Sequence, residues 1–156
     1  MDAWLAIRLA HIIGATLLFG TGLGTAFFMW RADRSGDVAA IAVTARNVVL
    51  ADWLFTAPAI VAQPITGYLL VLESGYRLTE GWLLLSLGLY AVAGVCWLPV
   101  VWLQARMRDL SLAARDGGTE LPPEYHRCMR IWFALGWPAF AAVAAIFALM
   151  VYRPVL

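Results

Sequence analysis

Charged residues are scarce in this sequence, and lysine is absent. Of the 156 residues only 13% are charged and 63% are hydrophobic, and all 11 basic residues are arginines. Soluble domains carry roughly 25% charged residues, and a soluble chain of this size could not bury so much apolar surface. This composition excludes an ordinary soluble domain and predicts a chain that resides in a lipid bilayer.

Cysteine and histidine are also scarce, with 2 residues of each. Cys96 falls in the middle of one apolar run and Cys128 near the start of another, so we expect them at different depths in the membrane. They form no C-x-x-C motif, and neither a disulfide nor a zinc site is predicted from them. The net charge of +1, with its basic excess on one side, indicates contact with anionic lipid and not with nucleic acid.

Four uncharged apolar runs dominate what is present, and each is long enough to cross a bilayer. A spanning helix needs about 18 or more apolar residues, and lipid satisfies no backbone polar group, so each run must be helical. We predict an all-α fold, a four-transmembrane-helix antiparallel bundle, in a single integral membrane domain covering residues 1–156. The predicted spans are residues 3–30, 48–72, 81–105 and 130–152.

The distribution of arginine predicts how the bundle is oriented. The side that holds the termini and the second connection has Arg77 and Arg153, and the first and third connections are flanked by Arg31, Arg34, Arg46, Arg106, Arg108, Arg115, Arg127 and Arg130. Cytoplasmic loops carry the excess of basic residues. We therefore predict that both termini lie on the periplasmic or outer side of a bacterial inner membrane.

The three connections differ in their predicted structure. The first part of residues 31–47 is polar, and the second part favours a short helix capped by Asp37. Residues 73–80 are few and predict an antiparallel hairpin of the second and third spans. Residues 109–125 contain the turn sequences DGG and LPPEY and predict a flexible loop. Prolines within the spans are expected to bend them and to shape a cavity; they are Pro58, Pro64, Pro99 and Pro138.

Glycine recurs at alternate positions in the stretch LLFGTGLGTAFF, residues 17–28. A nucleotide-binding loop is excluded, because the stretch lies inside a spanning helix and no strand precedes it. Gly20 and Gly24 instead form a G-x-x-x-G pair, and Gly14 adds a small residue nearby. Small residues let helices approach closely in lipid. They predict packing within the chain or, alternatively, a homo-oligomer through Gly14, Gly20 and Gly24.

Ionisable residues inside a span are candidates for function. Arg8 and His11 are three positions apart and share a helical face, which continues along the small residues of the first span. His11 should therefore point into the bundle. A neutral imidazole in such an interior is a good iron ligand, and the alternative is a histidine that ties two helices together by a hydrogen bond.

Other polar or sulfur-bearing side chains are predicted near His11 by their depth: Tyr68, Ser86 and Met150. Met150 could supply a second, sulfur ligand to iron or simply pack against neighbours. His126 is predicted roughly one membrane width from His11. Asp52, at the cytoplasmic start of the second span, is expected to pair with a nearby arginine (Arg46, Arg127 or Arg130), or alternatively to relay protons.

Four stretches carry a resemblance to a known superfamily: RLAHIIGATLLFGTGLG, TAPAIVAQPITGYLL, GWLLLSLGLY and RIWFALGWPAFAAVAAIFALMVYRP. They resemble the four-helix proteins that include the HemJ-type protoporphyrinogen oxidases and the membrane proteins of domain of unknown function 2269. In the HemJ-type enzymes, a first-span histidine preceded three residues earlier by a basic residue binds haem b, and His11 and Arg8 match these positions. The T-x-P pattern of the enzymes resembles Thr56, Ala57 and Pro58.

The sequence departs from the enzymes at two motifs. Ser86 stands where they have an essential lysine, and residues 135–138 read LGWP in place of N-E-x-P. The resemblance therefore implies haem b binding more than protoporphyrinogen oxidation. A similar first span in membrane copper-resistance proteins also implies a copper alternative.

These observations predict an oxidoreductase-like membrane protein that binds haem b in the outer half of the bundle. His11 would be the axial ligand, and the guanidinium fork of Arg8 would suit a haem propionate; Tyr68, Ser86 and Met150 complete the predicted site. Two alternatives are a non-enzymatic module that packs against itself or a partner, and a copper-handling protein that uses His11 and Met150.

Overall fold

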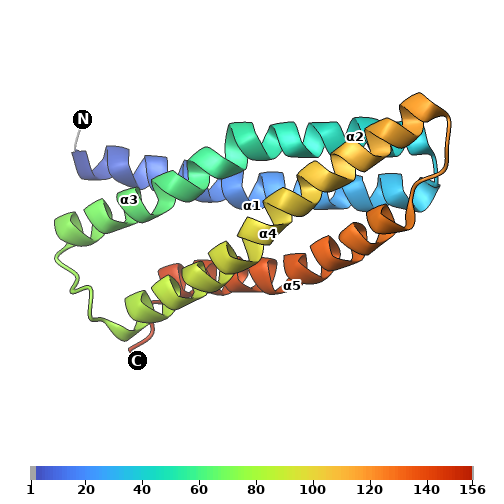
Figure 1. The fold of residues 1–156 in the computed structure, drawn as a ribbon. Helices are drawn as coiled ribbons and strands as arrows, with labels where there is room; N and C mark the ends of the chain where they lie inside the picture. The colour runs from blue at the N-terminus through green and yellow to red at the C-terminus, as the bar shows by residue number, and fades with distance from the viewer. Residues whose placement is uncertain (1–2, 156) are drawn as a thin grey trace.

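The computed structural model describes residues 3–155, which form helices and connections without any strand. The elements in chain order are α1 (Ala3–Ser35), α2 (Val38–Ala51), the π-helical η1 (Asp52–Thr56), α3 (Ala57–Ser74), α4 (Gly81–Gly117) and α5 (Pro123–Tyr152) (Figure 1). Helices α2, η1 and α3 follow one another without a break, so the described chain has 4 helices long and apolar enough to cross a membrane. This confirms the predicted all-α four-helix bundle.

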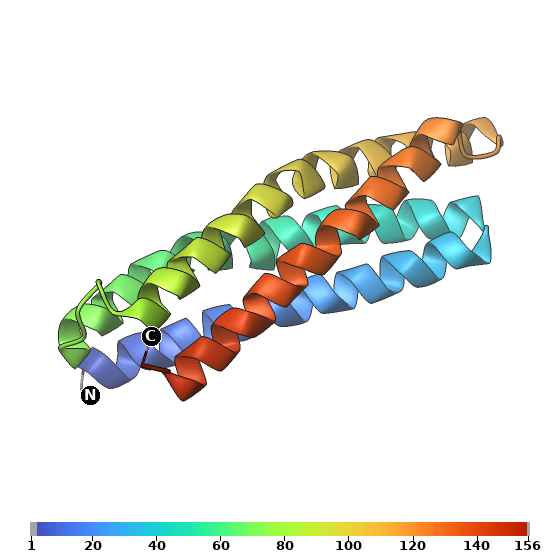
Figure 2. The ribbon, with the colours of Figure 1, turned by 90° about the horizontal axis from the view of Figure 1, so that it is seen from below.

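The helices form two pairs that separate toward one end. Helix α1 packs beside α3, and α4 beside α5, while α2 packs against α4 and α1 near the opposite end (Figures 1 and 2). No Cα atom of α3 lies within 8 Å of a Cα atom of α4 in the described chain. The second and third spans are nevertheless the predicted antiparallel hairpin: α2 packs against α4, and α3 and α4 meet through side chains, where the Tyr90 hydroxyl donates a hydrogen bond to the carbonyl of Ile60. We call the end that holds the termini the terminal end and the other the arginine-rich end.

At the arginine-rich end the helices extend past the predicted spans. Residues 109–117, predicted to belong to a flexible loop, continue α4, and only residues 118–122 connect it to α5. The loop prediction was wrong because Ser111 and Ala114 are buried among the neighbouring helices, which stabilises the helical conformation. Gly118 ends α4 with φ of 60°, and its N–H points back to the last carbonyls of the helix, as is usual for a C-terminal glycine.

The predicted capped helix after the first span is confirmed as α2. The side chain of Asp37 accepts a hydrogen bond from the backbone N–H of Ala39 at 2.9 Å. We expect Asp37→Ala to lower the free energy of unfolding by about 1 kcal/mol, because an unsatisfied N–H remains. Unfolding of detergent-solubilised protein measures this loss, and Asp37→Asn, which keeps an acceptor, should retain most of the stability. Equal losses in both variants would show that the cap contributes nothing.

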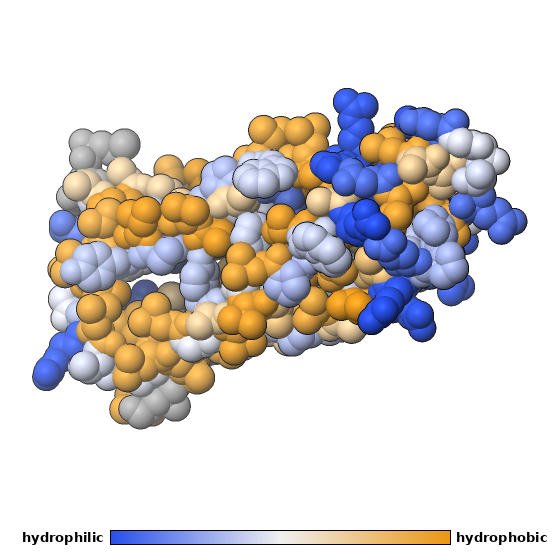
Figure 3. All heavy atoms as spheres, viewed as in Figure 1, coloured by the Kyte–Doolittle hydropathy of each residue, from blue (hydrophilic) through white to orange (hydrophobic). Residues whose placement is uncertain are grey.

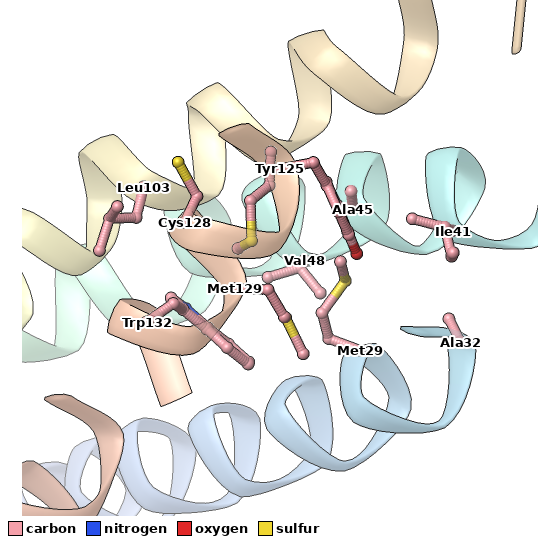
Figure 4. Close-up of a cluster of buried hydrophobic side chains, with 11 residues drawn as sticks. Met29, Ala32, Ile41, Ala45, Val48, Leu103, Tyr125, Cys128, Met129 and Trp132 are labelled. Carbon is pink, nitrogen blue, oxygen red and sulfur yellow. The ribbon is translucent and has the colours of Figure 1, made fainter. Parts of the chain in front are cut away.

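The main core lies at the arginine-rich end, where α1, α2, α4 and α5 meet (Figure 4). Figure 3 shows hydrophilic residues gathered over this end and apolar residues over the rest of the face in view. The cluster comprises Met29, Ala32, Ile41, Ala45, Val48, Leu103, Met107, Tyr125, Cys128, Met129 and Trp132. Water at the arginine-rich end makes burial of these side chains favourable, whereas lipid supplies no such drive between helices.

A smaller cluster closes the terminal end. Val71 of α3 packs there with Trp82 and Leu83 of α4, and Met150 of α5 lies against them. The two helix pairs thus meet through side chains at this end, beside a hollow that Figure 3 shows between them on the terminal side of the face in view.

Candidate functional site

A cavity of about 620 Å³ lies between the helices on the arginine-rich side of the bundle's middle. Each of its glycines, Gly22, Gly94 and Gly136, comes from a different helix, and the missing side chains contribute to the space. The larger lining residues are mostly aromatic and include Phe19, Phe27, Trp30, Tyr90, Trp97, Trp132, Trp137 and Phe140. A well-formed apolar cavity with a few convergent polar groups is the usual form of a small-molecule site.

Three buried polar side chains line this otherwise apolar cavity: Asp52, Thr56 and Gln104. The Thr56 hydroxyl donates a hydrogen bond to Asp52 Oδ1 at 2.8 Å, and Gln104 lies beside the same carboxylate. Among the ion pairs found in residues 3–155, none includes Asp52. The predicted pairing with an arginine is therefore wrong, because the candidate partners (Arg46, Arg127 and Arg130) are exposed while the carboxylate points inward.

The π-helical segment η1 places Asp52 and Thr56 at the cavity. Its signature is the N–H of Ala57, which donates to the carbonyl of Asp52 five residues earlier. In a regular α-helix the ring of Pro58 would clash with the carbonyl four residues before it, and the wider π turn accommodates the ring. Such single π turns occur often at functional sites.

His11 lies apart from this cavity, in the contact between α1 and α3. Its Nδ1 is 2.8 Å from Thr66 Oγ1, and the Thr66 hydroxyl donates its own proton to the carbonyl of Ala62 at 2.8 Å. With that proton on the Ala62 carbonyl, the Thr66 oxygen accepts from Nδ1–H and the Nε2 lone pair is free; in the other tautomer the Thr66 hydroxyl donates to Nδ1. No hydrogen bond to Nε2 is found in the described chain.

Small residues bring α1 and α3 close together around His11. The side chain of Gln63 donates to the His11 carbonyl at 2.9 Å, and a Cβ added to Gly14 would lie 2.5 Å from Gln63 Nε2. A Cβ added to Gly67 would lie 3.3 Å from the His11 ring. Gly14 therefore packs within the chain, which is one of the two roles predicted for the small residues of the first span.

The G-x-x-x-G pair behaves differently from Gly14. A Cβ at Gly20 or Gly24 would meet no heavy atom within 4 Å, so this pair does not pack within the chain. Contact within the chain is made instead by Gly22, where a Cβ would lie 3.3 Å from the ring of Phe140 on α5. A homo-oligomer stays a prediction, and it can use Gly20 and Gly24 but not the buried Gly14.

The structure does not gather the five predicted site residues. The Arg8 side chain is exposed, with its guanidinium 5.0 Å from the centre of the Trp4 ring, and Tyr68 is half exposed on the outer surface. Ser86 is buried and donates to the carbonyl of Trp82, while Met150 packs in the small terminal cluster. None of the five lines the 620 Å³ cavity, so this cavity is not the one expected around His11.

Thr66, the hydrogen-bond partner of His11, was not among the predicted site residues. Its signal was available, because Gln63 and Thr66 are polar residues three positions apart in a spanning helix and so share one face. Polar side chains in such helices commonly bond to a neighbouring helix. Within residues 3–155 no three histidine, cysteine or carboxylate side chains converge as a metal site.

The comparisons with known proteins give one match. A family model described as predicted integral membrane protein (DUF2269) matches residues 5–154, a range that includes both His11 and the cavity. No curated protein and no solved structure matches this chain.

Proposed function

The chain belongs to the DUF2269 family of predicted integral membrane proteins, and from that premise we propose that it binds haem b at His11 and has an oxidoreductase-like role. The observation that carries the proposal is the His11 imidazole, with Nδ1 2.8 Å from Thr66 Oγ1 and no hydrogen bond to Nε2 found in residues 3–155. Histidines that bind metals usually donate their other ring N–H to such a partner, which orients the ring. Haem iron would supply one-electron redox chemistry at this position.

The proposed haem would lie on the side of the His11 ring away from Thr66. Gly22, eleven positions after His11, is about three full turns further on and on the same face of α1, and it packs toward α5. The His11 ring itself contacts α3, and the proposed haem would extend from it toward α5, between the two helix pairs. Arg8, which forms no ion pair among residues 3–155, is proposed to bind a propionate from the terminal end.

The roles of the chain's own residues follow from this geometry. His11 binds through Nε2, Thr66 orients the ring, and Gln63 holds the His11 backbone. Met150 and Ser86 have no part in the proposal, because one packs in the terminal cluster and the other is bonded within its own helix.

The test is an absorption spectrum of detergent-purified protein expressed with a haem precursor. We expect a Soret band in the wild type, its loss in His11→Ala and its retention in His126→Ala, which removes the other histidine. Thr66→Val should keep a weaker or shifted band, because losing the residue that hydrogen-bonds a metal-binding histidine typically lowers metal affinity 10–100-fold. The proposal fails if the wild type has no Soret band or if His11→Ala keeps it unchanged.

A second candidate, a non-enzymatic packing module, rests on the same contacts. The bonds from His11 to Thr66 and from Gln63 to the His11 carbonyl join α1 to α3, as a helix tie would. In that case His11→Ala would destabilise the purified protein while the wild type showed no Soret band. Copper handling by His11 and Met150 stays a prediction; Met150 packs against the small terminal cluster.

A further inference from the structure

The Asp52 carboxylate is buried in the cavity without a cation. Asp52 is only 7% exposed; the Thr56 hydroxyl donates a hydrogen bond to its carboxylate, and the Gln104 side chain is a second hydrogen-bond partner. An ionised carboxylate that leaves water is costly unless it is both paired and hydrogen-bonded. Both partners are neutral, so the cavity holds a carboxyl group that a bound cation would keep ionised, near the arginine-rich end of the span.

The rest of the cavity wall suits an apolar cation. Trp97 and Trp132 are among its lining residues, and indole faces attract cations whose water has been removed. A lipid acyl chain would satisfy the apolar walls but not the carboxylate, and an anionic ligand would be repelled by it.

The cavity reaches the outer surface of the bundle between α1 and α5. Leu23 and Phe27 on α1 and Trp137 on α5 line it, and these side chains are 53%, 53% and 69% exposed. In a bilayer their exposed surfaces face lipid. A ligand can therefore enter sideways from the membrane, which favours a compound that partitions into lipid.

We propose that this cavity binds a lipophilic monocation, such as an amine or an onium ion, with its charge at Asp52 and its apolar groups among the aromatic side chains. The site shares no lining residue with the His11 contact. The cation proposal can therefore succeed or fail independently of the haem proposal.

The test is equilibrium binding of radiolabelled tetraphenylphosphonium to the protein in phosphatidylcholine nanodiscs. We expect saturable binding by the wild type and at least a tenfold weaker affinity in Asp52→Asn, which keeps the shape of the side chain. Asp116→Asn, which removes the same charge from an exposed residue paired with Arg115, should bind like the wild type. No saturable binding by the wild type, or equal binding by Asp52→Asn, would overturn the proposal.

A second pair of variants tests the cavity without changing charge. Gly94 lines the cavity and a Cβ there would meet nothing within 4 Å, so Gly94→Phe should fill the space without a backbone clash and abolish binding. Gly88→Phe, on the exposed surface of the same helix, should leave binding unchanged. Loss of binding in Asp52→Asn but not in Gly94→Phe would place the cation outside the cavity and contradict the inference.

Discussion

Replacing Met107 by alanine is expected to lower the free energy of unfolding by about 2–5 kcal/mol, the range for truncating a fully buried large side chain. Met107 is 1% exposed and lies in the core cluster where α1, α2, α4 and α5 meet. This cluster is the main contact between the two helix pairs, which separate toward the terminal end. A cavity here therefore weakens the whole bundle and not one helix alone.

Unfolding of the protein in mixed micelles, followed by tryptophan fluorescence or circular dichroism, measures the loss. Leu98→Ala on the same helix is the matched control, because Leu98 is 66% exposed and faces lipid or detergent, where truncation removes few protein contacts. We expect its effect to stay below about 1 kcal/mol, as for surface substitutions. Similar losses in the two variants would show that the cluster does not hold the bundle together.

Replacing Gly14 by leucine is expected to cost about 2–4 kcal/mol of stability, from overpacking between α1 and α3 and from a lost hydrogen bond. A Cβ at this position would lie 2.5 Å from Gln63 Nε2, so Gln63 must move and release the carbonyl of His11. The larger side chain would then push apart the helices that hold His11 against Thr66. Unfolding in detergent measures the loss, and any haem bound at His11 should be weakened as well.

Gly20→Leu is the control for this substitution. The same change six positions along α1 meets no heavy atom within 4 Å, and removing a helical glycine typically stabilises by about 0.5–1 kcal/mol. We therefore expect Gly20→Leu to be neutral or slightly stabilising. A large destabilisation, accompanied by loss of a dimer in cross-linking, would show that the Gly20–Gly24 face packs against a second copy.

The two proposed sites differ in the polar group that the chain supplies. At His11 the chain supplies one imidazole nitrogen in the contact between α1 and α3. At Asp52 it supplies one carboxylate inside an aromatic cavity. Both are polar groups that the chain does not fully satisfy, in an environment where lipid cannot do so either.

Several features follow from the sequence alone. Long uncharged runs must form helices in lipid, because no other backbone conformation satisfies its own polar groups there. The start of α2 was also predictable, because the side chain of an aspartate just before a helix accepts hydrogen bonds from the free N–H groups of the first turn. His11 was identified as an inward-facing residue from the small residues that share its face of the first span.

The partners of each helix were decided only by the tertiary structure. A spanning helix is apolar on all sides, so its sequence does not mark which face packs on which neighbour. The pairing of α1 with α3, the contact of His11 with Thr66 and the inward position of Asp52 all depend on that choice. The extension of α4 to Gly117 likewise depends on α2 lying beside it, because local turn residues favour a loop until neighbouring helices bury Ser111 and Ala114. The sequence by itself determined four membrane helices, and the packing between them determined where its few polar side chains meet.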